Sequence, residues 1–118
     1  MRALLLLLLL APVSAVAAEE SSERQVEFGL KVAQKGLWQE ARFRFERAVQ
    51  LDPGNTAALN DLAVSLEQMG EFDEARKAYE KALELKPGDL YIQQNYDLFR
   101  EADDKRNRKN KRKQRPQP

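Results

Sequence analysis

The sequence predicts an all-α protein, a short right-handed solenoid of about five antiparallel helices. A 34-residue pattern occurs twice, in residues 22–55 and 56–89. Within each copy, apolar residues recur at helical spacing in two runs separated by a glycine, which indicates helix, turn and helix. Each copy ends in a turn tetrapeptide, DPGN at 52–55 and KPGD at 86–89. A repeat of this period is typical of solenoids.

Residues 1–18 have the layout of an export signal. Arg2 precedes seven consecutive leucines at 4–10, and small residues lead to Ala18. A positive start, an apolar middle and small residues before a cleavage point are the parts of a secretory signal peptide. We therefore expect an exported protein, periplasmic or secreted, cut after Ala18. An uncleaved membrane anchor is the alternative, since about 16 residues of low polarity approach the roughly 20 that span a bilayer.

The helices of the two repeats follow from their apolar positions. In the first copy, Phe28 and Val32 mark the first helix and Gly36 the turn. The second helix carries small and apolar residues at helical spacing: Ala41, Phe45, Ala48 and Leu51. In the second copy the same positions hold the following residues: Leu62, Leu66, Gly70, Ala75, Tyr79, Ala82 and Leu85. Small residues at these spacings predict faces where two helices approach closely.

Start and stop signals agree with this division. Pro53 and Pro87 end the second helices, because proline disfavours helical geometry in the preceding residue and donates no backbone hydrogen bond. Asn55 and Asp89 are suited to cap the helices that follow. Ser22, with a glutamine three residues later, predicts a capping box at the first helix.

Residues 89 to about 104 predict a capping helix. The apolar stripe continues through Tyr96 and Phe99, but Asp97 and Arg100 stand where the earlier copies have small or apolar packing residues. A second helix in this copy would need those two positions to be apolar. We therefore expect a single helix that covers the open flank of the second repeat, as solenoid ends require.

The pattern over residues 22 to about 100 resembles the tetratricopeptide repeat family. Its most constant positions are matched in both copies by Gly29, Ala41, Phe45, Ala48 and Pro53, then by Ala63, Ala75, Tyr79, Ala82 and Pro87. Gln25 and Leu59 replace the family's early tryptophan. The resemblance implies a concave groove, lined by the first helix of each repeat, that binds an extended peptide or a partner helix.

The resemblance also implies which residues face the groove: Val26, Leu30, Ala33, Asn60, Val64, Glu67, Gln94 and Leu98. Leu30, Val64 and Leu98 would form an apolar ladder, and the amides of Asn60 and Gln94 can pair with a peptide backbone. The alternative is that the ladder packs against neighbouring helices.

One row of this face differs from family members that hold a C-terminal carboxylate with basic residues. Here the row is Glu27, Asp61 and Asn95. We therefore expect an apolar or basic ligand in preference to an acidic one.

Side chains suited to catalysis or metal binding are scarce. The chain has no histidine and no cysteine, which excludes thiol chemistry and disulfides. Asp61 and Glu67 are interpreted as solvated helix charges, not as an acid and base pair. The adjacent carboxylates at 73–74 and 103–104 lack the alternating spacing of a calcium loop. We expect no catalytic residue, no metal site and no cofactor.

The charge is divided between an acidic body and a basic tail. Residues 19–104 hold 11 basic and 19 acidic side chains, a net charge of −8. The tail, residues 105–118, has no acid and eight basic side chains: Lys105, Arg106, Arg108, Lys109, Lys111, Arg112, Lys113 and Arg115. We expect it to be disordered and suited to anionic surfaces such as lipid, envelope polymer or nucleic acid. Without aromatic residues, sequence-specific nucleic-acid binding is not expected.

These features predict a non-catalytic adaptor or scaffold of the cell envelope or extracellular space. It would bind an unidentified protein or peptide partner in the groove. The sequence leaves three alternatives open for the tail: a tether to an anionic surface, self-assembly into homo-oligomers through acidic bodies and basic tails, or a solubilising segment that pairs loosely with its own body.

Overall fold

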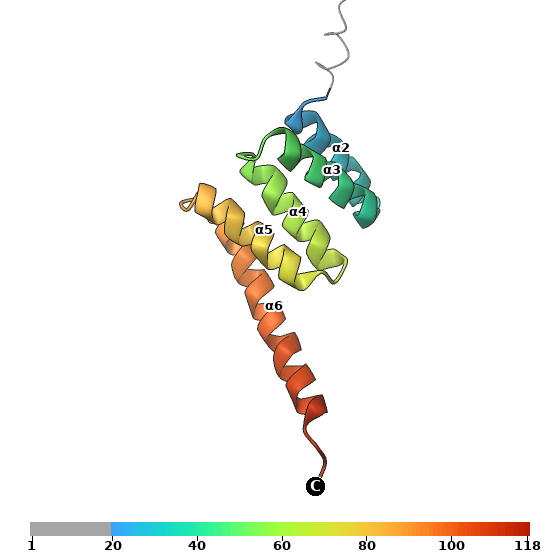
Figure 1. Ribbon diagram of the computed structural model, residues 1–118, viewed down its shortest axis with the longest axis vertical. Helices are drawn as coiled ribbons and strands as arrows, with labels where there is room; N and C mark the ends of the chain where they lie inside the picture. The colour runs from blue at the N-terminus through green and yellow to red at the C-terminus, as the bar shows by residue number, and fades with distance from the viewer. Residues whose placement is uncertain (1–19) are drawn as a thin grey trace, which may run out of the picture.

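The computed structural model describes residues 20–118, which fold as α-helices joined by short turns (Figure 1). The expected export signal lies outside the described residues. The helices of the described part are α2 (Ser22–Gln34), α3 (Trp38–Leu51), α4 (Thr56–Gln68), α5 (Phe72–Leu85) and α6 (Leu90–Gln114). The helices α2 and α3 form the first repeat, α4 and α5 the second, and α6 stands alone. The predicted all-α helical-repeat fold is confirmed.

Polar side chains cap the first helix of each repeat. Asn55 and Asp89 each accept a hydrogen bond, at 3.1 Å, from the backbone N–H three residues later, as predicted. The cap of α2 is Ser21, so the capping box predicted at Ser22 is wrong. Ser22 lies inside the helix instead, where its buried Oγ donates to the carbonyl oxygen of Ala48 at 2.8 Å. This bond ties the start of α2 to the end of α3.

Glycines make the turn inside each repeat. Gly36 and Gly70 have φ angles of 74° and 78°, a left-handed conformation that costs a residue with a Cβ about 1–2 kcal/mol. The two turns therefore reverse the chain in the same way, and α2 and α4 lie antiparallel to α3 and α5 (Figure 1).

Small residues allow the helices to approach, as the sequence predicted. A Cβ added to Gly29 would lie 2.5 Å from Cε1 of Phe45, so only glycine fits beneath that ring. Six alanines have no solvent-exposed surface: Ala41, Ala48, Ala58, Ala63, Ala75 and Ala82. Larger side chains at these positions would force the backbones apart and leave gaps in the core.

The repeats stack through their apolar side chains. Leu62 on α4 packs against the core of the first repeat, which includes Val32 and Phe45. In the second repeat, Tyr79 and Phe99 lie in one buried cluster, with their ring centroids 5.5 Å apart. The helix α6 thus covers the flank of α5, as the predicted capping helix should.

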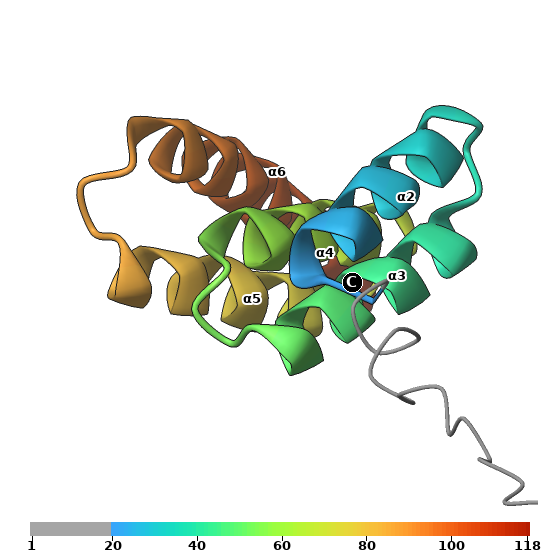
Figure 2. The same ribbon diagram turned by 90° about the horizontal axis from the view of Figure 1, so that it is seen from above.

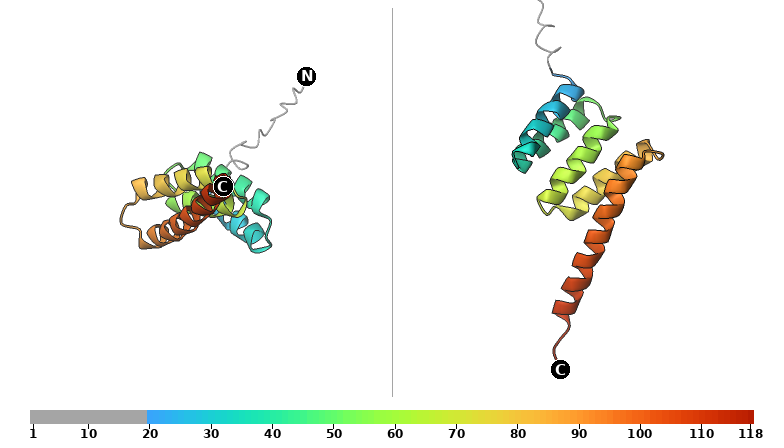
Figure 3. Two further views of the ribbon diagram at one scale, coloured as in Figure 1. Left: turned by 90° about the horizontal axis from the view of Figure 1, so that it is seen from below. Right: turned by 180° about the vertical axis from the view of Figure 1, so that it is seen from behind.

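The helix α6 does not end where the basic segment begins. It runs to Gln114, so the prediction that residues 105–118 are disordered is wrong for most of that segment (Figure 3). The buried carboxylate of Asp103 accepts hydrogen bonds from Arg76 on α5 and from Arg106 one turn later. These bonds fasten α6 at the point where its apolar residues stop. Basic side chains in the last turn also favour the negative end of a helix dipole.

None of the described helices combines the length and the apolar character needed to cross a membrane.

Candidate functional site

The first helices of the repeats face a shared groove. Figure 2 shows α2 and α6 on either side of α4, with α3 and α5 on the opposite side. Two cavities, of about 270 Å³ and 320 Å³, lie along this face. Leu30, Asp61 and Tyr91 line both of them. One side chain each from α2, α4 and α6 therefore defines the centre of the groove.

Half of the residues predicted to face the groove line these cavities. They are Leu30, Ala33, Asn60 and Val64. Leu30 is 44% exposed, although it lies between helices, and Val64 is half-buried beside it. An exposed leucine next to a half-buried valine leaves apolar surface open to a ligand. Their binding role stays a prediction.

The other four predicted residues lie outside the cavities. Val26 packs against the core of the first repeat, and Gln94 and Leu98 are exposed farther along α6. Glu67 is half-buried and accepts a hydrogen bond from the hydroxyl of Tyr79 at 3.2 Å. The apolar ladder is thus interrupted after Val64.

The sequence suggested that Asn60 offers its amide to a ligand. In the structure this amide is engaged within the protein instead. The side chain of Asn60 is buried, and its Oδ1 accepts a hydrogen bond from Nδ2 of Asn95 at 3.1 Å. Its own Nδ2 donates to Oδ1 of Asp61 at 3.4 Å. The bond from Asn95 joins α4 to α6 across the floor of the groove. Asn60 therefore sets the spacing of the two helices.

The structure assigns a larger place in the groove to Asp61, which sequence reasoning treated as a solvated charge. Burial raises the pKa of Asp61 to about 6, and the hydrogen bond from Asn60 opposes the rise. No ion pair reaches this carboxylate from residues 20–118. The helical pattern places Asp61 in its row on the helix, but only the neighbouring helices show that it is half-buried.

Two aromatic residues of the groove were also missed. Tyr91, 67% exposed at the start of α6, lines both cavities, and Trp38 at the start of α3 lines the smaller one. Tyr79 is buried, with its hydroxyl near Glu67, Tyr91 and Asp61. Burial and the nearby Glu67 raise the pKa of Tyr79 well above its usual range, so this hydroxyl stays protonated and donates. The signal in the sequence was the position of Tyr91, 34 residues after Ala57 on the same helix face.

Comparison with known proteins agrees with this geometry. A family model described as tetratricopeptide repeat matches residues 33–94, more than half of the chain. The chain belongs to the tetratricopeptide repeat family. Tetratricopeptide repeats are generally protein-interaction modules. No curated protein matches the sequence.

Solved tetratricopeptide structures share the fold. The second such domain of human RPAP3, solved in complex with the HSP70 peptide SGPTIEEVD, is 18% identical with a TM-score of 0.65, covering 68% of this chain and 67% of that one. The Sgt2 domain from Aspergillus fumigatus is 19% identical with a TM-score of 0.70, covering 75% of this chain and 60% of that one. MamA protein is 30% identical with a TM-score of 0.66, covering 75% and 48%. The chain therefore spans about half of MamA.

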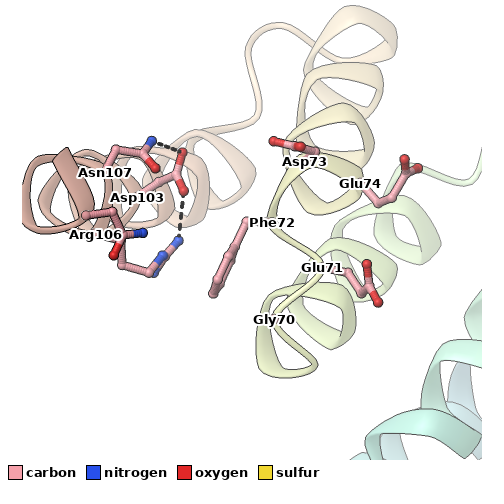
Figure 4. Close-up of a pocket in the computed structure, with 9 residues that line it drawn as sticks. Gly70, Glu71, Phe72, Asp73, Glu74, Asp103, Arg106 and Asn107 are labelled. Atoms are coloured by element: carbon pink, nitrogen blue, oxygen red, sulfur yellow. Dashed lines mark hydrogen bonds and ion pairs between the residues drawn. The ribbon is translucent and has the colours of Figure 1, made fainter. Parts of the chain in front are cut away.

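Beyond the tetratricopeptide repeats, the last turns of α6 form a basic helical arm, residues 105–115. Arg106 is docked rather than free: its guanidinium lies 3.5 Å from the ring centroid of Phe72 and 3.1 Å from Oδ1 of Asp103 (Figure 4). Lys105 pairs with Glu101 at 2.9 Å. Six basic residues of the arm have no ion pair within residues 20–118: Arg108, Lys109, Lys111, Arg112, Lys113 and Arg115.

A further cavity, of about 430 Å³, lies where the arm leaves the second repeat (Figure 4). Asp103, Arg106 and Asn107 line it from α6, and Phe72 lines it from α5. Asn107 Nδ2 donates to Oδ2 of Asp103 at 3.5 Å. Asp103, Arg106 and Asn107 are thus engaged with one another, and their effect is to hold the arm in its direction.

Proposed function

We propose that this protein is a non-catalytic adaptor of the cell envelope or extracellular space that holds a peptide or helix in the groove of its tetratricopeptide repeats. The export part of the proposal rests on the layout of residues 1–18, and the binding part rests on the groove. The observation that carries it is the apolar surface around Leu30, Val64 and Tyr91, left open between three helices. The RPAP3 domain, which shares the fold, was solved with a peptide bound.

The mechanism is static complementarity. Asn60 and Asn95 fix the distance between α4 and α6, and Gly29 fixes the approach of α2 to α3. The groove is therefore formed before the ligand arrives, and little of the binding free energy is lost in ordering it. Apolar side chains of the ligand would remove the exposed parts of Leu30 and Tyr91 from water, and each burial contributes part of the about 1.5–3 kcal/mol of a complete one.

A photo-reactive amino acid at position 91 tests the groove. We expect it to cross-link a partner in cell-envelope fractions, and Leu30→Glu to reduce that capture at least tenfold. The matched control carries the photo-reactive residue at position 85, because Leu85 is exposed to the same degree as Leu30, 44% each, but lines neither groove cavity. Equal capture from both positions, or capture that survives Leu30→Glu with unchanged helicity, contradicts the proposal.

A second candidate function concerns the helical arm. The end of α6 extends beyond the repeats (Figure 1). Five of the six cations that have no ion pair within residues 20–118 lie on this helix and the sixth, Arg115, is its C-cap, which favours a tether to an anionic surface. If all six displace counterions from a DNA duplex used as a model polyanion, log affinity should fall with log salt at a slope of about −5, from roughly 0.9 per charge. The control is the full chain with these six residues changed to glutamine. A salt-independent affinity, or one retained by the control, rules the tether out.

Self-assembly through the arm makes a different prediction. Acidic bodies that bind basic arms of other copies would give a mass that rises with protein concentration at low salt. The same glutamine variant should then remain monomeric in sedimentation equilibrium.

A further inference from the structure

The groove contains a carboxylate to which residues 20–118 bring no cation. Asp61 lines both cavities together with Leu30 and Tyr91. Its one hydrogen bond from the described residues comes from Asn60 Nδ2, at 3.4 Å, which is long for such a contact. A peptide that filled the groove would cover the water-exposed part of this carboxylate. Removing water from an unpaired charge is costly unless the ligand brings a compensating group.

Charged groups around Asp61 do not supply that compensation. On the same helix, Glu67 accepts from Tyr79 of α5 and is itself acidic. Lys86, in the turn before α6, lines the larger cavity but pairs with Asp89 at 3.9 Å.

The other three helices that line the two cavities, α2, α3 and α6, bring no cation into them. On α2, the equivalent of Asp61 is Glu27, which pairs with Lys31 at 3.4 Å. The contributions of α3 and α6 to the cavities are Trp38, Phe45, Tyr91 and Ile92, which carry no positive charge.

We infer that the groove selects a peptide that presents a lysine or arginine side chain to Asp61, between apolar side chains that pack on Leu30, Val64 and Tyr91. This inference rests on the proposed function. The aliphatic stem of such a side chain packs on apolar surface while its charged end reaches the carboxylate. The ring of Tyr91 adds a cation–π contact for the same group.

The inferred ligand differs in charge from the peptide bound by the RPAP3 domain. That peptide, SGPTIEEVD, ends in three acidic residues out of its last four. In this chain the carboxylate of Asp61 lines both groove cavities, with no ion pair to it from residues 20–118. Like charges repel more strongly as water is excluded. An acidic peptide is therefore disfavoured here.

Selection from a displayed library of random 12-residue peptides tests the inference at pH 7.5. The targets are the full chain, Asp61→Asn, and the double variant Leu30→Glu with Tyr91→Glu, whose two sites are exposed enough to leave the fold intact. We expect the unchanged chain to enrich lysine or arginine flanked by apolar residues. Asp61→Asn should select apolar peptides without that enrichment, and the double variant should select neither.

One selected peptide is then compared with its norleucine counterpart, which keeps the four-carbon stem and lacks the charge. We expect the lysine form to bind at least tenfold more tightly at pH 7.5, and the ratio to fall to near one in Asp61→Asn. It should also fall near one at pH 5, where Asp61 is mostly protonated because burial raises its pKa to about 6. The chain has no histidine that would titrate in this range.

The outcomes separate the two proposals. If the lysine and norleucine forms bind equally, and Leu30→Glu with Tyr91→Glu abolishes both, the groove binds peptides but the role of Asp61 is wrong. If no selected peptide depends on Leu30 and Tyr91, the proposed function fails as well. A further outcome is that a second copy of this chain displaces the library peptides from the groove at low salt, whereas the glutamine variant of the arm does not. The occupant of the groove is then the arm, and the inference is overturned.

Discussion

Equivalent positions of the two repeats carry the same helices in different surroundings. Phe28 in the first repeat is 45% exposed, whereas its equivalent in the second, Leu62, is half-buried against the first repeat. Lys31 lies on the surface, but its equivalent Ser65 is fully buried. Within the described chain, the second repeat has a neighbour on each flank and the first has one. The motif thus determines the helices, while the neighbouring repeat determines which of their positions become core.

The two repeats also differ in the charge of the side chain on the flank. Arg44 of the first repeat lies over the ring of Phe28, 4.3 Å from its centroid, and shields it from water. Its equivalent in the second repeat is Ala78, which is buried in the cluster that Phe99 of α6 completes. A long cationic side chain therefore covers the open flank, and a small apolar one admits the capping helix.

Exchanging the flank residues Arg44 and Ala78 should give the largest difference between the repeats in the free energy of unfolding. Ala78→Arg places a guanidinium where α6 packs, and the overpacking and buried charge should lower the free energy of unfolding by about 3 kcal/mol or more. Arg44→Ala removes half-buried cation–π contacts with Phe28 and Phe43, a long hydrogen bond to Gln25 and an ion pair with Glu40. These contacts are individually weak, so the cost should be about 1 kcal/mol. Urea unfolding followed by circular dichroism measures both.

Loss of α6 docking alone would show in a second measurement. The fluorescence of the single tryptophan, Trp38, reports on the first repeat, so its transition should shift less than the overall loss of helix if Ala78→Arg releases only α6. Costs of equal size for Ala78→Arg and Arg44→Ala would show that α6 does not cap the second repeat.

Sequence reasoning found the helices and the core because both depend on local pattern. Local signals mark the helix boundaries to within a few residues: the prolines, the caps Asn55 and Asp89, and the glycine turns. The 34-residue period places the packing residues. It failed at α6, where a single buried residue, Asp103, fastens a segment whose composition favours disorder. No periodicity marks such a contact.

The groove was only half predicted for a related reason. Leu30 and Val64 could be placed on a helix face, but whether Asp61 is solvated depends on how α2 and α6 approach α4. Asn60 shows the same limit, since its amide is engaged by Asn95, which lies 35 residues away in the sequence. Pairings at that distance are not encoded in the pattern of one helix.

Neutralising the equivalent carboxylates Asp61 and Glu27 should give a smaller difference in the free energy of unfolding. Its sign is opposite, because the change at Asp61 stabilises the protein. The pKa of Asp61 is raised to about 6, so the folded state binds a proton more readily than the unfolded state, and stability falls as pH rises through this window. Asp61→Asn should therefore raise the free energy of unfolding at pH 7. The full shift corresponds to about 3 kcal/mol, which solvent access to a half-buried group reduces to about 1–2 kcal/mol.

Two controls accompany this variant. At pH 4, where Asp61 is largely protonated in the folded state, the gain from Asp61→Asn should nearly vanish. Glu27→Gln removes the exposed pair with Lys31 and should change the free energy of unfolding by less than about 0.5 kcal/mol at either pH. A gain at pH 7 that persists undiminished at pH 4 would mean that packing, not charge, is responsible.

The smallest difference is expected at the turns, where the two repeats have the same surroundings. Gly36 and Gly70 share a positive φ, and a Cβ added to either would meet no atom within 4 Å. Gly36→Ala and Gly70→Ala should therefore each lower the free energy of unfolding by about 1–2 kcal/mol, through backbone strain alone. Thermal unfolding of the two variants should give equal shifts. A larger cost at Gly70 would show that the second repeat resists strain because α6 holds it, so that the effect of the neighbour extends from the packed faces to the turns.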